Sequence, residues 1–323
     1  MRAVLCKALS GPEGLSVEEI AAPEPQDDEV VVKVKAVGLN FFDTLIIQGK
    51  YQIKPKLPFS PGGEIAGIVA KVGARVRGLK EGDRVMGYVG HDGAREEIAV
   101  AAWRLSLIPP DLSDAAAAGL SITYGTTLHA LRDRADLQPG ETLAVLGASG
   151  GVGQAAVEIG KLMGAEVIAC ASSDDKLGFC KDLGADHLVN YAAQNLKDAL
   201  RALKPGGIDV VYDPVGGAYS EFGVRALAWN GRHLVVGFAQ GDIPKLPLNL
   251  VLLKSANILG VFWGAHIDHE PDKHRANMDQ LLAWAAAGSL KPHIHKVYRF
   301  DEIASALDAI ARREVKGKVI LVP

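Results

Sequence analysis

The chain of 323 residues is 48% hydrophobic and contains 36 glycines, a composition that suits two globular domains with their own cores. Its formal net charge of −3 excludes a general electrostatic attraction to nucleic acid or to an anionic membrane. Three scattered cysteines are too few for a disulfide framework, and no apolar run is long enough to span a bilayer. The first residues also lack the apolar region of a signal peptide, so we expect a cytoplasmic protein without membrane or nucleic-acid partners.

The first 110 residues are rich in strand patterns and poor in helical periodicity. Short apolar or alternating runs between glycine turns predict strands at Val30–Val37, Ile65–Val72 and Asp83–Tyr88. The sequence therefore predicts a β-rich domain at the start of the chain.

After two consecutive prolines at 109 and 110, the composition changes to an alanine-rich helix, predicted over 114–131. From Thr142 onward, apolar runs alternate with helical periodicity, which indicates repeated βα units and a parallel, doubly wound sheet. The predicted strands are Thr142–Leu146, Glu166–Ala171, His187–Tyr191, Ile208–Tyr212, His233–Phe238 and Ile258–Phe262. The predicted helices between them are Asp174–Leu183, Leu196–Leu203 and Ala218–Ala228. A helix over Asp301–Ala311 and a last strand over Lys318–Val322 follow, and these terminal elements are expected to complete the β-rich domain.

A glycine-rich turn, GASGGVG at 147–153, lies between a buried strand and a helix. In this position glycines permit a tight turn and bring backbone amides close to a pyrophosphate at the start of the helix. The same residues satisfy the G-x-S-x-G pattern of a hydrolase nucleophile elbow, with Ser149 as nucleophile and Asp213 and His233 or His266 as later partners. The β-rich beginning of the chain counts against a hydrolase, because its sheet should alternate with helices from the start.

The end of the second predicted strand favours NADPH over NADH. An NAD site usually has an acidic residue about 20 residues beyond the glycines, where it binds the ribose 2′-hydroxyl. Here Ser172 and Ser173 occupy that place, and Lys176 supplies a cation for a 2′-phosphate. An alternative role for these serines is helix capping, with Ser172 and Asp175 as a capping box.

Seven short motifs together resemble the zinc-free, zeta-crystallin-like quinone oxidoreductases of the medium-chain dehydrogenase/reductase superfamily. They are Val37–Asp43, Gly49–Tyr51, Phe59–Gly67, Gly82–Val85, Leu183–Asp186, Asp213–Gly217 and Gly317–Val319. The resemblance implies an α/β protein with a GroES-like catalytic domain at 1–118, completed by about 265–323. A Rossmann domain at 119–264 would bind NADPH, and two chains would dimerise through the edge strand Ile258–Phe262.

Zinc-dependent relatives carry Gly-His-Glu where this chain has Gly62, Gly63 and Glu64, and a cysteine near Leu39 and Asn40. The resemblance therefore implies no catalytic metal and a structural role for Glu64. A second group of potential ligands, the histidines between His266 and His274, is polar and followed by proline. We expect it to form a solvated loop and no metal site.

Without a metal, the simplest hydride acceptors are quinones or alkenes conjugated to a carbonyl. The resemblance implies that Asn40 orients the reactants and that Tyr51 donates a hydrogen bond or proton. It also implies these cofactor contacts: Gly150, Gly151, Val152, Gly153, Ser172, Ser173, Lys176, Tyr191, Gly237, Phe238, Phe262, Trp263 and Lys318. Our first hypothesis is an NADPH-dependent quinone reductase. The alternatives are a reductase of enones or enoyl thioesters such as acryloyl-CoA, and an NADPH-binding protein without catalytic activity.

Overall fold

The computed structural model describes residues 1–323, which form two compact units. The β-rich unit comprises Met1–Ile122 and Met278–Pro323, and the Rossmann unit comprises Thr123–Asn277. The sequence predicts breaks at 118/119 and 264/265, whereas the compact units part after Ile122 and after Asn277.

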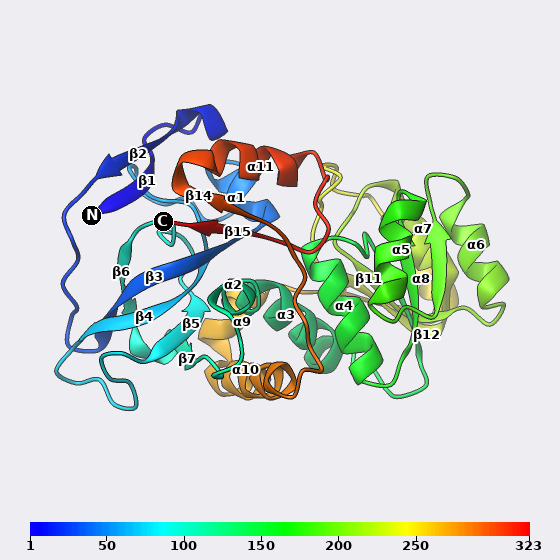
Figure 1. Cartoon of the computed structure of the whole chain (residues 1–323). Coiled ribbons are helices and arrows are strands. Elements are labelled where there is room, and N and C mark those ends of the chain that lie inside the picture. The colour runs from blue at the N-terminus through cyan, green and yellow to red at the C-terminus, as the bar shows by residue number, and fades with distance from the viewer. The chain divides into compact units, whose positions relative to one another are not determined.

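The β-rich unit is built on a seven-stranded sheet with the order β14-β15-β3-β4-β5-β7 and with β6 also paired to β3. Its strands are β3 (Glu29–Leu39), β4 (Glu64–Val72), β5 (Arg84–Tyr88), β6 (Glu97–Ala101), β7 (Leu105–Leu107), β14 (Ile294–Arg299) and β15 (Lys318–Val322). A smaller antiparallel pair joins β1 (Arg2–Cys6) to β2 (Leu15–Glu19). The strand β15 lies antiparallel beside β3, so the C-terminal segment completes the N-terminal sheet (Figure 1).

The core of this unit contains the β-branched residues of the long strands and the side chains of a C-terminal helix. Residues from β3, β4 and β15 pack with Phe300 and Leu307 in one buried cluster. The unit's helical segments are η1 (Pro12–Gly14), α1 (Phe41–Ile46), η2 (Ala102–Arg104), α2 (Asp114–Ala118), η4 (Phe300–Glu302) and α11 (Ile303–Ala311). Burial of this apolar surface from both ends of the chain is the main force that joins them.

The Rossmann unit contains a six-stranded sheet in which all neighbours are parallel. The strand order is β10-β9-β8-β11-β12-β13, which is the 3-2-1-4-5-6 order of a dinucleotide-binding fold. The strands are β8 (Thr142–Leu146), β9 (Glu166–Ala171), β10 (His187–Asn190), β11 (Ile208–Asp213), β12 (Leu227–Val235) and β13 (Asn257–Gly260). All five residues of β8 are buried, as expected for a central strand covered on both faces.

Helices connect and flank these strands (Figure 1). They are α4 (Gly151–Leu162), α5 (Asp174–Asp182), α6 (Leu196–Leu203), α7 (Ala218–Ala226) and α8 (Leu248–Lys254). The unit also contains α3 (Ser121–Leu128), η3 (His129–Arg134), α9 (Trp263–His269) and the first residues of α10 (Pro271–Ala286), whose residues from Met278 onward belong to the β-rich unit. The α/β fold class and the doubly wound parallel sheet are confirmed. The strand Glu166–Ala171 and the helix Leu196–Leu203 have their predicted bounds.

Three local predictions are wrong. The helix predicted over 114–131 is broken after Ala118, where Gly119 caps α2, and it ends in the π-helix η3. The strand predicted at His233–Phe238 lies further upstream, at β12. The region between His266 and His274 is not a loop, because α9 ends at His269 and Pro271 begins α10. Proline suits the first turn of a helix, where its missing N–H has no acceptor, so it separates two helices here.

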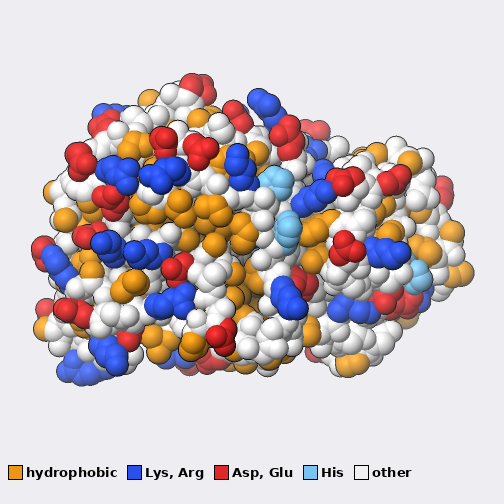
Figure 2. Space-filling view, in the orientation of Figure 1, with side chains coloured by type: hydrophobic (Ala, Val, Ile, Leu, Met, Phe, Trp, Pro, Cys, Tyr) orange, Lys and Arg blue, Asp and Glu red, His pale blue; other side chains and the backbone are white.

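No helix combines the length and the apolar composition needed to cross a membrane. On the face in Figure 2, acidic and basic side chains are interspersed and form no large field of one sign. This distribution agrees with the small net charge of the whole chain.

Candidate cofactor and catalytic sites

The glycine-rich turn follows the central strand β8 and leads directly into α4. Its first residue, Gly147, adopts the left-handed conformation with φ of 60°. The amide of Ala148 donates to the carbonyl of Cys170 at 3.1 Å, which ties the turn to the neighbouring strand β9. The turn therefore lies at the point where the strand order reverses, the usual ligand-binding position in such sheets.

The start of α4 fits a pyrophosphate. The amides of Gly151, Val152 and Gly153 occupy the first helical positions, which have no i−4 acceptor within the helix. A Cβ atom on Gly153 would lie only 2.2 Å from the carbonyl oxygen of Gly147, so any larger residue would disrupt the turn. The fourth predicted amide differs, because Gly150 donates to Gly147 at 3.0 Å and caps the helix.

A second turn, after β11, lies beside the glycine turn. Its organiser is Asp213, whose Oδ1 accepts the amides of Val215 and Gly216 at 2.9 Å each. Its Oδ2 accepts the hydroxyl of Ser220 at 2.5 Å and lies 3.2 Å from Nε2 of His233. Burial opposes the charge of Asp213, but the neighbouring imidazole of His233 and the hydrogen bond from Ser220 hold the pKa of this carboxyl below its usual value. The carboxylate of Asp213 thus fixes the conformation of the turn after β11, beside the glycine-rich turn.

These contacts also remove the hydrolase alternative. Asp213 and His233 are buried and are engaged with each other and with Ser220, not with Ser149. Ser149 is a largely buried turn residue. A serine nucleophile needs a base within hydrogen-bond reach, and the hydrogen bonds of this structure give Ser149 none.

The residues predicted for the 2′-phosphate gather at the carboxyl end of β9. Ser173 is the N-cap of α5, and its Oγ accepts the amide of Lys176 at 3.4 Å. The predicted capping role of the two serines is therefore confirmed for Ser173, whereas the capping box of Ser172 and Asp175 is wrong, and Ser172 remains exposed. Nζ of Lys176 lies 3.5 Å from Oγ of Ser172, while Tyr191 donates its amide to the last residue of β9 at 3.1 Å. Ser172, Lys176 and Tyr191 thus lie together at the carboxyl end of β9.

The residues predicted near the nicotinamide follow β12 and β13. The amide of Gly237 lies 3.4 Å from the carbonyl of Asp213, so Gly237 and Phe238 run beside the second turn. Phe262 is 55% exposed at the start of α9, whereas Trp263 is buried, with its ring 5.5 Å from that of His274. Of these two aromatic residues, Phe262 has the surface available for a ligand.

In the β-rich unit, Asn40 belongs to a buried polar cluster. Its Nδ2 donates to Oε1 of Glu64 at 2.9 Å, and its Oδ1 accepts Nζ of Lys318 at 2.7 Å. Lys318 also donates to Glu64 at 2.7 Å and to the carbonyl of Leu39 at 3.0 Å. An ammonium group has three protons, and all three have acceptors here. This geometry favours a positioning role for Lys318 over the predicted contact with the cofactor.

Tyr51 lies near this cluster, but its polar group is not bound within the chain as those of the cluster are. Its hydroxyl group makes no hydrogen bond within the chain, while its ring packs on Phe42 with centroids 5.2 Å apart. Burial, together with the nearby carboxyl of Asp43, raises the pKa of Tyr51 above its usual value. A neutral phenol that keeps its proton and has no internal acceptor is suited to donate a hydrogen bond to a ligand.

The structure leaves no place for the catalytic zinc of the metal-dependent relatives. A Cβ atom on Gly63 would lie 2.4 Å from the ring of Phe42, so a histidine does not fit there. The carboxylate of Glu64 is occupied as well, since its Oε2 accepts the amide of Ile122 at 2.7 Å and its Oε1 binds Lys318. Where the zinc-dependent relatives bind their metal, this chain has an ion pair between Glu64 and Lys318. This ion pair supports the structural role expected for Glu64.

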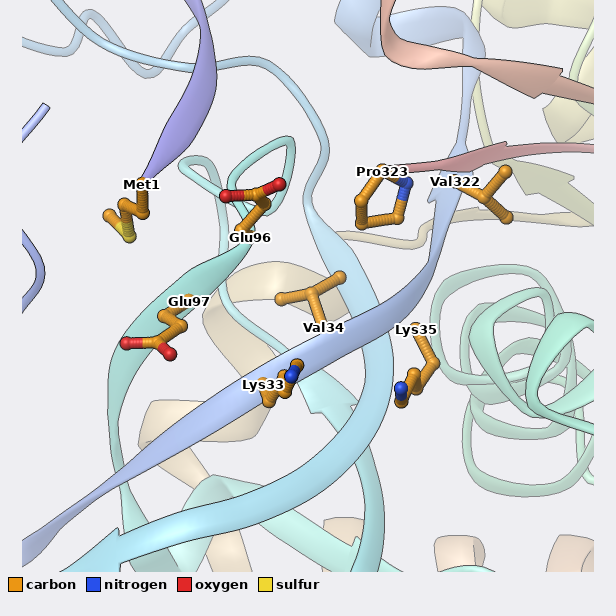
Figure 3. Close-up of a pocket in the computed structure, with 8 residues that line it drawn as sticks. All are labelled: Met1, Lys33, Val34, Lys35, Glu96, Glu97, Val322 and Pro323. Carbon is orange, nitrogen blue, oxygen red and sulfur yellow. The ribbon is translucent and has the colours of Figure 1, made fainter. Parts of the chain in front are cut away.

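The β-rich unit also carries an open groove (Figure 3). It is lined by Met1, Lys33, Val34, Lys35, Glu96, Glu97, Val322 and Pro323. Its two lysines and two glutamates offer no field of one sign to a charged ligand. None of the predicted site residues lines it.

Family models and homologues agree with this arrangement. Residues 26–109 match the alcohol dehydrogenase GroES-like domain, and residues 151–286 match the domain described as zinc-binding dehydrogenase. A quinone oxidoreductase-like protein 2 homolog from Nematostella vectensis is 40% identical over 328 residues, covering 99% of this chain and 88% of that protein. The chain belongs to the zinc-free quinone oxidoreductase family of the medium-chain dehydrogenases/reductases.

Solved structures of this oxidoreductase family extend the agreement to the whole chain. The Escherichia coli quinone oxidoreductase complexed with NADPH has a TM-score of 0.93 and 27% identity, with 100% of both chains covered. The CurK enoyl reductase has a TM-score of 0.89 and 27% identity, with 99% of this chain and 98% of that chain covered. The chain is therefore an oxidoreductase with the fold of nicotinamide-dinucleotide enzymes.

Two buried networks escaped prediction from sequence. One is the cluster of Lys318 with Glu64, which are 254 positions apart. The other joins Tyr124, Gln154 and Glu158, with the phenol donating to the glutamate at 2.5 Å. Glutamine and glutamate at i and i+4 on the apolar face of α4 were the available signal, because buried polar residues need partners.

Proposed function

We propose that this enzyme reduces quinones with NADPH and without a metal. The cofactor part of the proposal is carried by the cradle of free amides at Gly151–Gly153 together with the acid-free end of β9. The first feature suits the pyrophosphate of a dinucleotide, and the second suits a 2′-phosphate. The quinone part is supported by the likeness to the quinone oxidoreductase-like protein 2 homolog and to the Escherichia coli quinone oxidoreductase.

The preference for NADPH rests on charge at the end of β9. The lysine side chain at 176 offers a cation, and the exposed hydroxyl of Ser172 offers a hydrogen-bond donor. The nearest acid, Asp174, lies in the first turn of α5 and accepts a hydrogen bond from Asn190 at 2.8 Å. It is therefore engaged with protein rather than placed as the ribose ligand that NADH requires.

Bound NADPH supplies the hydride, and the protein must stabilise the negative charge that develops on the acceptor oxygen. In the proposed mechanism the hydroxyl of Tyr51 donates a hydrogen bond to that oxygen. Lys318 and Glu64 hold the amide of Asn40 in one orientation, and Asn40 in turn caps α1 and fixes the chain that leads to Tyr51. A quinone would accept one hydride from the cofactor and one proton from water and leave as the hydroquinone.

A second candidate reaction is the reduction of a carbon–carbon double bond conjugated to a carbonyl. It is favoured by the likeness to the CurK enoyl reductase over nearly the whole chain. The same donor at Tyr51 would serve this reaction, because charge again develops on a carbonyl oxygen. The size and shape of the acceptor, rather than the donor, would separate the two reactions.

The test is a steady-state assay of NADPH oxidation with matched panels of quinones, enones and enoyl thioesters. Quinones should give the highest kcat/KM. A clear preference for enoyl thioesters would replace the first candidate by the second. Tight NADPH binding without turnover of any acceptor would favour a non-catalytic binding protein.

We also propose a cytoplasmic homodimer. The three cysteines are buried thiols without a disulfide, which suits a reducing compartment. The edge strand β13 has one unpaired side, and the neighbouring helix α8 exposes Leu248, Leu252 and Leu253 by 70% or more. Such an edge with apolar neighbours is suited to a two-fold contact. Light scattering of the wild type and of Leu252→Lys checks this, since the variant should shift the mass from dimer to monomer.

A further inference from the structure

A group of metal-binding side chains lies in the Rossmann unit, away from the glycine turn. His129 and Asp133 belong to the π-helix η3, and His266 belongs to α9. One potential ligand atom from each residue lies within 4.8 Å of the other two. Nδ1 of His129 is 2.9 Å from Oδ2 of Asp133, and Nε2 of His266 is 3.9 Å from the same oxygen. Two imidazoles and one carboxylate thus converge from two helical segments.

The cluster is buried, and part of it has no partner. The side chain of His266 is 3% exposed, and its Nε2 makes no hydrogen bond. Asn277 is fully buried and its Oδ1 is also unpartnered, although its Nδ2 donates to Oδ2 of Asp133 at 2.8 Å. Buried polar atoms are normally hydrogen-bonded, so these two unsatisfied acceptors beside one carboxylate are open to a cation or to a proton donor.

A second carboxylate fixes the orientation of His266. Oε2 of Glu270 lies 2.9 Å from Nδ1 of this imidazole, one turn further along the chain. With its proton on Nδ1, the ring presents an unprotonated Nε2 toward Asp133. Histidines that bind a metal through one ring nitrogen usually donate the N–H of the other to a carboxylate or carbonyl, which fixes the orientation of the ring.

We propose that His129, Asp133 and His266 bind one divalent metal ion of the zinc class, with Asn277 and water available for the remaining positions. Two nitrogens and one carboxylate oxygen suit zinc or cobalt and do not suit magnesium, which prefers oxygen ligands. The ion would clamp η3 to α9. It lies outside the β-rich unit, where zinc-dependent relatives carry their catalytic ion, and it takes no part in the proposed hydride transfer.

Binding requires a defined movement of side chains. Ligand atoms around a tetrahedral zinc ion are about 3.3 Å apart, given metal–nitrogen distances of about 2.0 Å. The rings of His129 and His266 are stacked with centroids 3.8 Å apart and an interplanar angle of 19°. One ring must therefore turn out of the stack, and the proton shared by His129 and Asp133 must leave.

The experiment uses the full-length, untagged protein after treatment with a chelator. Zinc or cobalt is added, free metal is removed, and bound metal is counted by plasma mass spectrometry. The wild type should hold one ion per chain, the cobalt form should show visible absorption bands, and magnesium should not bind. His266→Ala and His129→Gln should lose the stoichiometric ion.

The matched control is His269→Ala, which removes an exposed histidine from the same helix and should keep the ion. Glu270→Gln should bind zinc about 10- to 100-fold more weakly, because the imidazole loses its supporting carboxylate. Metal-free melting temperatures verify that all variants fold. The proposal is overturned if the wild type binds no zinc or cobalt, if His266→Ala keeps the ion, or if His269→Ala loses it equally.

Discussion

The candidate site of the Rossmann unit consists of backbone groups, whereas that of the β-rich unit consists of side chains. The Rossmann unit forms its cradle from backbone amides and glycines within seven consecutive residues, 147–153. The β-rich unit forms its polar centre from the side chains of Asn40, Glu64 and Lys318, which come from distant parts of the chain. The first kind of site is set by local conformation, whereas the second depends on correct folding of the whole unit.

This difference separates binding from catalysis. Changes in the cradle should affect cofactor affinity and leave the β-rich unit intact. Changes in the polar centre should affect stability and turnover and leave the cradle intact.

Lys318→Met should have the largest effect. It leaves the carboxylate of Glu64 buried without its cation, and breaking such a buried pair costs about 3–5 kcal/mol of unfolding free energy. Denaturant unfolding measures this loss. Lys7→Met is the control, since Lys7 pairs with Glu18 on the surface and should change stability by less than about 1 kcal/mol. Equal effects of the two variants would show that the buried pair has no special role.

Gly153→Ala should reduce NADPH affinity by about 100-fold, since its methyl group collides with the carbonyl of Gly147 and displaces the amides of the cradle. Isothermal titration measures the affinity. Gly178→Ala is the control, because a Cβ atom at Gly178 in α5 meets no atom within 4 Å. An unchanged affinity in Gly153→Ala would place the pyrophosphate elsewhere.

Tyr51→Phe should lower kcat by about 10- to 100-fold and leave NADPH affinity unchanged, as expected for the loss of one hydrogen bond to a developing charge. Because burial raises the pKa of Tyr51 above its usual value, the phenol keeps its proton between pH 6 and pH 9. The wild-type profile of kcat/KM should therefore show no step that Tyr51→Phe removes in this range. Such a step would mean that Tyr51 ionises during turnover.

The sequence predicted the parts of the fold that depend on neighbouring residues. The buried runs of β8 and β9, the glycine turn and the helix α6 are local patterns, and the structure has them at or near their predicted bounds. The break at Gly119 was not predicted, because the run Ala115–Ala118 directly before it favours a continuing helix. Gly119 is itself a poor helix former, and it caps α2 there.

The polar centres could not be predicted in the same way. Nothing near Lys318 indicates Glu64 as its partner, because the contact depends on the pairing of β15 with β3. Similarly, His266 looked like a loop residue, since its neighbours are polar and Pro271 follows. Only the packing of α9 buries its side chain. Non-local contacts of this kind carry no short-range signal in one sequence.

Lys176→Ala should have the smallest effect, about tenfold on NADPH affinity, the value of one charge-assisted hydrogen bond to a phosphate. The affinity for NADH should change by less than about twofold, because NADH carries no 2′-phosphate. Fluorescence titration with both dinucleotides measures the ratio. Equal losses for the two would assign Lys176 to the stability of α5.

The most direct test of the proposed cofactor site is the titration of the wild-type protein with NADPH and with NADH under identical conditions. The acid-free end of β9 predicts that NADPH binds about tenfold more tightly. Equal affinities, or tighter binding of NADH, would contradict the assignment of Ser172 and Lys176 to the 2′-phosphate.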